Sequence, residues 1–170
     1  MINKRTGIIT MGTNPMTLVG NEIDIGDTGF DFTAFNNDLT PFKLSDIKSK
    51  VKIISVVPSV DTGVCELQTI RFNEEASKLK DTAIITISVD LPFAQGRFCA
   101  NKGIEQSITV SDYKDLSFGL NYGFVIEELR LLARGIVVLD ENNVVKYTEY
   151  VPEVTNHPDY DKAIEIAKNI

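Results

Sequence analysis

Two apolar segments with a helix-spaced segment between them limit the fold most tightly. Residues 51–57, VKIISVV, form a near-continuous apolar run, and residues 83–89, AIITISV, form a second one. Runs of this kind suit strands that are covered on both faces of a sheet. Residues 64–80 lie between them and repeat at the spacing of one helix face, which carries Cys65, Phe72, Ala76 and Leu79. Strand, helix and strand in this order predict a right-handed parallel crossover.

Shorter patterns before this unit predict small β elements. Turn-forming residues at 12–15 separate two apolar segments, which predicts a hairpin over residues 7–19. Phe30 and Phe32 are spaced to share one face of a further short strand. Residues 44–47 suit a single helical turn.

Longer patterns follow the unit. Asp90 is suited to cap a helix with Pro92 in its first turn, which would fade near residues 101–103. A short strand at 108–110, a helix over 115–123, an antiparallel hairpin over 135–151 and a C-terminal helix over 159–169 complete the chain. The sum is an α/β fold with a central mixed sheet flanked by helices on both faces, a thioredoxin-like layout preceded by an extra N-terminal β-hairpin.

Length and composition favour one ordinary globular domain, residues 1–170. The apolar fraction is 43% and the charged fraction 24%, so neither disorder nor a fibrous class is indicated. A net charge of −7 argues against nucleic-acid binding, which depends on lysine and arginine displacing counterions from phosphates. No apolar stretch has the length of a signal peptide core or a membrane span. We therefore expect a cytoplasmic protein.

Cys65 falls in the first turn of the helix predicted after the strand at 51–57. Unpaired backbone N–H groups and the positive end of the helix dipole stabilise a negative charge there. A thiol reacts as its thiolate, and an unperturbed cysteine with a pKa of about 8.5 is mostly protonated at neutral pH. A nearby cation would help, and four arginines are candidates that spacing alone cannot rank: Arg71, Arg97, Arg130 and Arg134. Asp61 and Glu66 would oppose ionisation if they faced the sulfur.

Two residues near Cys65 have a structural and a functional interpretation. Thr62 suits the N-cap of the helix, and its hydroxyl also suits a hydrogen bond to the sulfur or to a bound oxygen. Pro58 either ends the strand or shields a thiolate. His157 is the only histidine and lies in a polar segment, where a solvated surface position is the simplest interpretation. No zinc-ligand spacing can be assembled, and no metal, flavin or haem is expected.

The residues around the two cysteines resemble a known family. Residues 58–65, PSVDTGVC, are similar to the active-site signature of peroxiredoxins, with proline and threonine seven and three residues before the peroxidatic cysteine. Together with residues 88–99, SVDLPFAQGRFC, this segment resembles the bacterial thiol peroxidases, the atypical two-cysteine branch. The likeness extends from about Gly7 to the C-terminus.

The resemblance implies a thioredoxin-dependent peroxidase that acts on hydrogen peroxide and organic hydroperoxides. Cys65 would become a sulfenic acid and Cys99 would condense with it to an intrachain disulfide. Thr62 and Arg134 match the residues that orient the peroxide and stabilise the thiolate, and Pro58 matches the shielding proline. The resemblance also implies a homodimer and reduction by thioredoxin.

Three alternatives remain at this stage. Both cysteines could be inert core residues, a common fate of cysteine. The chain could be a peroxide-sensing thiol-disulfide protein on the same fold, which would share the chemistry and need a protein partner. A non-catalytic binding module would leave peroxide unconsumed. The absence of a Cys-x-x-Cys motif argues against a disulfide oxidoreductase.

Overall fold

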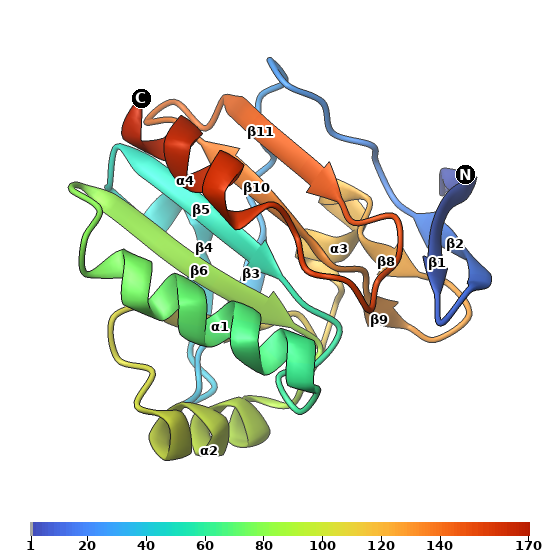
Figure 1. The fold of residues 1–170 in the computed structure, drawn as a ribbon, viewed down its shortest axis with the longest axis horizontal. Coiled ribbons are helices and arrows are strands. Elements are labelled where there is room, and N and C mark those ends of the chain that lie inside the picture. The colour runs from blue at the N-terminus through green and yellow to red at the C-terminus, as the bar shows by residue number, and fades with distance from the viewer. Residues whose placement is uncertain (1) are drawn as a thin grey trace.

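The computed structural model describes residues 2–170, and its main sheet has seven strands (Figure 1). Their order across the sheet is β11 (Val145–Tyr150), β10 (Gly135–Leu139), β5 (Val51–Val56), β6 (Thr82–Ser88), β7 (Ile108–Ser111), β3 (Thr33–Phe35) and β4 (Pro41–Lys43). Strands β5, β6 and β7 are parallel to one another, and the remaining pairs are antiparallel. Helix α1 (Gly63–Ala76) connects β5 to β6, so the predicted strand-helix-strand unit is confirmed.

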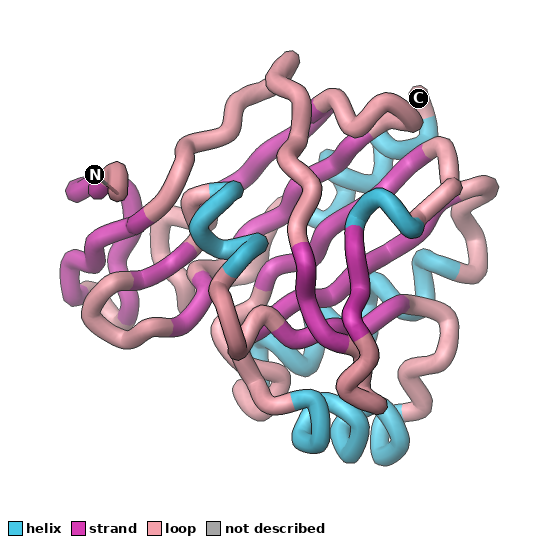
Figure 2. Tube along the Cα trace, turned by 180° about the vertical axis from the view of Figure 1, so that it is seen from behind, coloured by secondary structure: helices cyan, strands magenta, loops and turns pink. Residues whose placement is uncertain are grey.

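Helices cover both faces of this sheet, as expected. Helices α1 and α4 (Tyr160–Lys168) lie on the face seen in Figure 1, and the short α3 (Ser117–Tyr122) lies on the face seen in Figure 2. Buried side chains form a large apolar cluster on each face of the sheet. Because side chains alternate along a strand, those of β10 are divided between the two clusters. Ile136 packs in the same cluster as Phe72 of α1, whereas Val137 packs in the cluster that contains Phe118 of α3. Strand β10 is therefore buried on both faces.

Helix α2 (Pro92–Lys102) follows β6 and packs on β7. Since β5 and β6 are parallel, α1 and α2 both begin at the carboxyl edge of the sheet. Pro92 occupies the first helical turn, as predicted, but the expected cap is wrong: the N-cap residue is Leu91. Asp90 instead accepts hydrogen bonds from Ser59 Oγ (2.7 Å) and from the backbone N–H of Val60 (2.8 Å). Its carboxylate thus ties the end of β6 to the segment that leads into α1.

The predicted N-terminal hairpin is present and belongs to a second sheet. Strands β1 (Lys4–Met11) and β2 (Asn14–Val19) are joined at Gly12 and Thr13, whose φ angles of 56° and 68° give the tight turn that suits a twisted hairpin. Strand β2 also pairs with β8 (Val125–Ile126), and β8 with β9 (Leu131–Leu132). The result is a four-stranded antiparallel sheet beside the main one (Figure 1).

The remaining secondary-structure expectations are confirmed with one exception. Residues Leu44–Asp46 form a single 3-10 turn, and the strand, helix and hairpin predicted after residue 107 are present. Phe30 and Phe32 do not share a strand face, because β3 begins only at Thr33; Phe30 is half exposed and Phe32 is buried. Among residues 2–170, every helix is too short or too polar to cross a membrane.

Candidate functional site

Cys65 is the third residue of α1 and is completely buried. Its position in the first helical turn is the predicted one, and there backbone N–H groups without helical partners and the helix dipole favour negative charge. The thiol packs in an apolar cluster of side chains from the segment before α1, from α2 and from the loop after it: Val57, Val60, Phe98 and Ile104. The sulfur therefore lies in a shielded environment at the edge of the sheet.

Arg134 is the arginine that reaches this sulfur. It lies immediately before β10 and is only 2% exposed. Its Nη2 donates to Cys65 Sγ at 3.1 Å, its Nη1 to Gln68 Oε1 at 2.8 Å and its Nε to the carbonyl of Val154 at 2.6 Å. Within residues 2–170 no carboxylate forms an ion pair with Arg134. The sulfur of Cys65 is therefore in direct contact with a buried guanidinium whose other two partners are neutral oxygen atoms.

Gln68 is a site residue that we did not identify from the sequence. Its amide oxygen accepts from Arg134, while its Nε2 donates to Ser55 Oγ at 2.8 Å and to the carbonyl of Val56 at 3.4 Å. The amide therefore fixes the guanidinium to the end of β5. The sequence does contain a signal for this residue. Gln68 lies three residues after Cys65 and four before Phe72, so that a polar side chain falls on the buried face of the helix.

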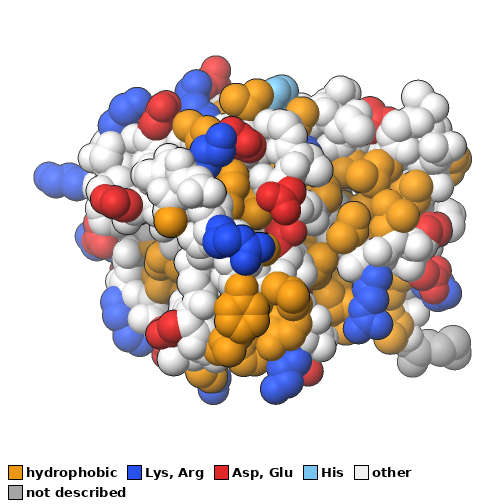
Figure 3. Space-filling view, turned by 90° about the horizontal axis from the view of Figure 1, so that it is seen from below, with side chains coloured by type: hydrophobic (Ala, Val, Ile, Leu, Met, Phe, Trp, Pro, Cys, Tyr) orange, Lys and Arg blue, Asp and Glu red, His pale blue; other side chains and the backbone are white. Residues whose placement is uncertain are grey.

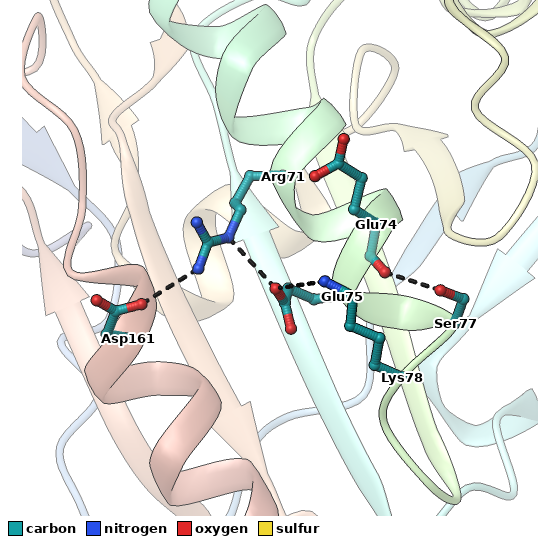
Figure 4. Close-up of polar contacts among 6 residues, drawn as sticks. All are labelled: Arg71, Glu74, Glu75, Ser77, Lys78 and Asp161. Carbon is teal, nitrogen blue, oxygen red and sulfur yellow. Dashed lines mark hydrogen bonds and ion pairs between the residues drawn. The ribbon is translucent and has the colours of Figure 1, made fainter.

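The other three candidate arginines lie elsewhere. Arg71 forms ion pairs with Asp161 of α4 (3.2 Å) and with Glu75 (3.5 Å), as Figure 4 shows. Lys78 binds the same Glu75 carboxylate, so this group joins α1 to α4. Arg97 and Arg130 are exposed. Spacing could not rank the four arginines, and the tertiary structure brings only Arg134 to the thiol.

Thr62 and Pro58 lie on the segment that leads into α1. Thr62 is the N-cap residue, but its hydroxyl makes no capping hydrogen bond; it is exposed and has a long contact of 3.4 Å with the carbonyl of Ser59. Its hydroxyl is therefore available to a ligand near the helix N-terminus. Pro58 is buried and follows directly on the apolar end of the β5 segment. Both residues lie in the segment between β5 and Cys65.

Cys99 lies on α2, is partly buried, and packs against the cluster that contains Cys65. Its Sγ is 3.4 Å from the hydroxyl of Thr109, and both cysteines are free thiols. Each cysteine is held in its own helix, and a disulfide between them would need their Cα atoms within about 7 Å of each other.

Polar contacts connect the two cysteine helices at the surface. Lys102 of α2 forms an ion pair with Glu66 of α1 at 2.7 Å, so Glu66 is engaged with a cation. Asn73 of α1 accepts from the backbone N–H groups of Gln106 (2.8 Å) and Ser107 (3.1 Å), just beyond α2. The ion pair joins α2 to α1, and the Asn73 contacts join α1 to the segment between α2 and β7.

Metal-ligating side chains do not cluster in the structure. Among residues 2–170, no group of three or more His, Cys, Asp and Glu side chains is placed to hold a metal ion. His157 is exposed, and its Nδ1 forms a hydrogen bond with the hydroxyl of Tyr160 at 2.7 Å. Burial of the phenol raises the pKa of Tyr160 to about 12, so that this hydroxyl stays protonated at neutral pH.

The fold and much of the sequence are similar to those of known peroxidases. The family model described as Redoxin matches residues 24–164. A thiol peroxidase from Halalkalibacterium halodurans is 60% identical over 94% of this chain and 96% of its own length, and one from Bacillus subtilis is 58% identical over the same shares. The crystal structure of a peroxiredoxin-like protein from Aquifex aeolicus superposes with a TM-score of 0.90 at 34% identity, covering 99% of this chain and 98% of that one. The chain therefore belongs to the redoxin family and, within it, to the thiol peroxidases.

Proposed function

We propose that Cys65 is the thiolate with which this thiol peroxidase attacks its peroxide. The observation that carries the assignment is the 3.1 Å contact between Arg134 Nη2 and Cys65 Sγ in a buried site. The thiolate attacks one peroxide oxygen and the O–O bond breaks. The sulfur is oxidised to a sulfenic acid, and the other oxygen takes a proton and leaves as water or an alcohol.

Arg134, Thr62 and Pro58 have distinct parts in this proposal. The guanidinium favours the thiolate and stabilises the charge that develops on the leaving oxygen. The exposed hydroxyl of Thr62, which makes no capping bond, donates to the peroxide and orients it. Pro58 is buried in the segment that leads into α1, and its part is to shield the sulfur from water.

Cys99 is the proposed resolving cysteine. Its thiol condenses with the sulfenic acid of Cys65 to give an intrachain disulfide and one water molecule. Because Cys99 packs against the Cys65 cluster but belongs to another helix, part of α2 must open before the sulfurs can meet. The contacts of Lys102 and Asn73 then set how readily this happens.

A thiol peroxidase needs a peroxide and a thiol reductant, and we propose thioredoxin as the reductant. Thioredoxin would return both sulfurs to thiols by disulfide exchange. Exposed apolar side chains on the two cysteine helices and at the N-cap of α2 support docking of a protein there: Leu67, Leu91 and Phe93 are each more than half exposed. Figure 3 views the molecule from the side where α2 lies and shows apolar side chains gathered on this side.

We also propose that the protein is a homodimer. We place it in the cytoplasm, a reducing compartment in which the thiols are regenerated.

A coupled assay tests the cycle. NADPH oxidation through thioredoxin reductase and thioredoxin is followed with hydrogen peroxide and with an organic hydroperoxide, in wild type, Cys65→Ser and Cys99→Ser. We expect no turnover without Cys65. Without Cys99, we expect one oxidation of Cys65 and loss of thioredoxin-dependent turnover. Turnover that survives in Cys65→Ser, or a disulfide that mass spectrometry places between two chains, overturns the assignment.

A further inference from the structure

Val154, whose carbonyl accepts a hydrogen bond from Arg134, is itself held by the N-terminal hairpin. Arg134 Nε donates to the carbonyl of Val154, at 2.6 Å. The backbone N–H of Val154 donates in turn to the carbonyl of Thr10 in β1 (2.9 Å), and the N–H of Thr10 donates to the carbonyl of Pro152 (2.7 Å). The hairpin thus fixes residues 152–154 by two backbone hydrogen bonds.

Glu153 joins this segment to the turn of the hairpin. Its carboxylate accepts hydrogen bonds from Thr10 Oγ1 (3.1 Å) and from the backbone N–H groups of Gly12 (3.2 Å) and Thr13 (2.7 Å). It also accepts from the N–H (2.9 Å) and the hydroxyl (2.8 Å) of Thr155. The left-handed φ angles of Gly12 and Thr13 belong to the turn that presents its N–H groups to this acceptor. The hydrogen bond from Thr13 is the largest cause that lowers the pKa of Glu153 to about 2, so the carboxylate is charged at neutral pH.

We propose that Glu153 is a positioning residue for Arg134 and that it acts by clamping the hairpin turn onto residues 152–155. Since one of the three groups that hold the guanidinium is the carbonyl of Val154, a shift of this segment moves the guanidinium relative to Cys65 Sγ. A buried charge contact is sensitive to small changes in distance and direction. The hairpin is then part of the machinery that prepares the thiolate. This inference rests on the proposed roles of Cys65 and Arg134.

Glu128 provides a matched control. It is also a glutamate outside the main sheet whose carboxylate accepts from the hairpin, since both of its oxygens lie 3.0 Å from the backbone nitrogen of Thr17 in β2. It has no hydrogen bond to residues 151–155 or to Arg134. Glu128→Gln therefore weakens the fixation of the hairpin without disturbing the connection to the guanidinium.

The test follows the thiolate directly and uses no peroxide. In the full chain with Cys99→Ser, Cys65 is the only thiol, and its alkylation rate is measured as a function of pH. We expect Glu153→Gln to move the midpoint of this profile to higher pH, which lowers the alkylation rate about 3-fold at pH values below the midpoint. Thr10→Val, which removes one donor to the carboxylate, should give a smaller shift in the same direction. Glu128→Gln should leave the profile unchanged.

The outcomes separate the clamp from the proposed function. An unchanged profile in both Glu153→Gln and Thr10→Val overturns the inference, as does an equal shift in Glu128→Gln, which would show a general effect of hairpin stability. If Glu153→Gln does not fold, Thr10→Val against Glu128→Gln decides. Arg134→Lys is measured in the same background: if its profile also matches that of the parent, the role of Arg134 fails, and the fault lies with the proposed function.

Discussion

Arg134 Nη2 lies 3.1 Å from Cys65 Sγ, although the two residues are 69 positions apart in the chain. Both side chains are buried, and the guanidinium has an amide oxygen, a carbonyl and the sulfur as its partners. In the proposed mechanism the thiolate of Cys65 balances the charge of this cation. The contacts that hold Arg134 would then also activate Cys65.

Replacement of Arg134 by lysine tests this relationship. Lysine keeps the charge but presents one ammonium group in place of the planar guanidinium, so it cannot serve Val154, Gln68 and Cys65 together. We expect the rate of Cys65 oxidation by peroxide to fall about 100-fold, the usual cost of losing an oriented donor at a developing charge. Stopped-flow measurement of the first oxidation step is the readout. Arg71→Lys, on the exposed side of α1, is the control, and an equal loss in both variants would contradict a specific role.

The sequence predicted the strand-helix-strand unit and the cysteine at its helix N-terminus because these depend on local patterns. Periodicity places Cys65 at the start of α1 and the apolar run of β5 in the centre of the sheet. The two-residue strands β8 and β9 carry too short a pattern to be seen, and they exist because β2 offers an unpaired edge.

Side-chain partners between distant segments were the part that sequence could not supply. Asp90 is a residue type that often caps helices, and it lies just before α2. Its carboxylate instead accepts hydrogen bonds from Ser59 and Val60, which folding brings to the same edge of the sheet. Glu153 and Thr13 are 140 residues apart in the chain, and no local sequence pattern predicts their hydrogen bond. Gln68 could in principle have been identified from the sequence, since it places a polar side chain on a buried helix face.

Gly96 and Gly103 of α2 offer opposite tests of helix opening. Gly96 lies inside the helix, where an added Cβ meets Asn37 Cβ at 3.7 Å, an ordinary contact. Gly96→Ala should therefore stabilise the helix by about 1 kcal/mol. Gly103 is the C-cap with φ +66° and open space around it, so Gly103→Ala strains the helix end.

After a peroxide pulse, Gly96→Ala should form the disulfide more slowly, with more over-oxidation of Cys65, because α2 opens less often. Gly103→Ala should form it faster, with less over-oxidation. Rapid acid quench followed by mass spectrometry measures both species. Equal rates in wild type and both variants would show that opening of α2 does not limit the reaction.

The ion pair between Glu66 and Lys102 should slow disulfide formation slightly. It bridges the two cysteine helices at 2.7 Å and is partly exposed, so it contributes at most about 1 kcal/mol. Lys102→Met should raise the rate of disulfide formation by up to about 5-fold, and salt should raise the wild-type rate but not that of the variant. Lys78→Met removes an ion pair that stays near the end of α1, with Glu75, and should leave the rate unchanged. A salt effect of equal size in wild type and Lys102→Met would rule out this contribution.

Asp112 should make the stability of the fold fall as the pH rises. Burial is the main cause, and it raises the pKa of the Asp112 carboxyl group from 3.8 to about 6. The backbone N–H groups of Phe118 and Gly119, which donate to the carboxylate, lower this pKa and offset part of the effect. The folded state then holds this proton more tightly than the unfolded state. The stabilisation is present below about pH 4 and is lost as the pH rises through about 6, a change of at most roughly 3 kcal/mol. Urea unfolding of wild type and Asp112→Asn at pH 4.5 and 7.5 measures it: relative to wild type, the variant should be more stable at pH 7.5 than at pH 4.5. An equal difference at both pH values would show that Asp112 does not titrate in this range.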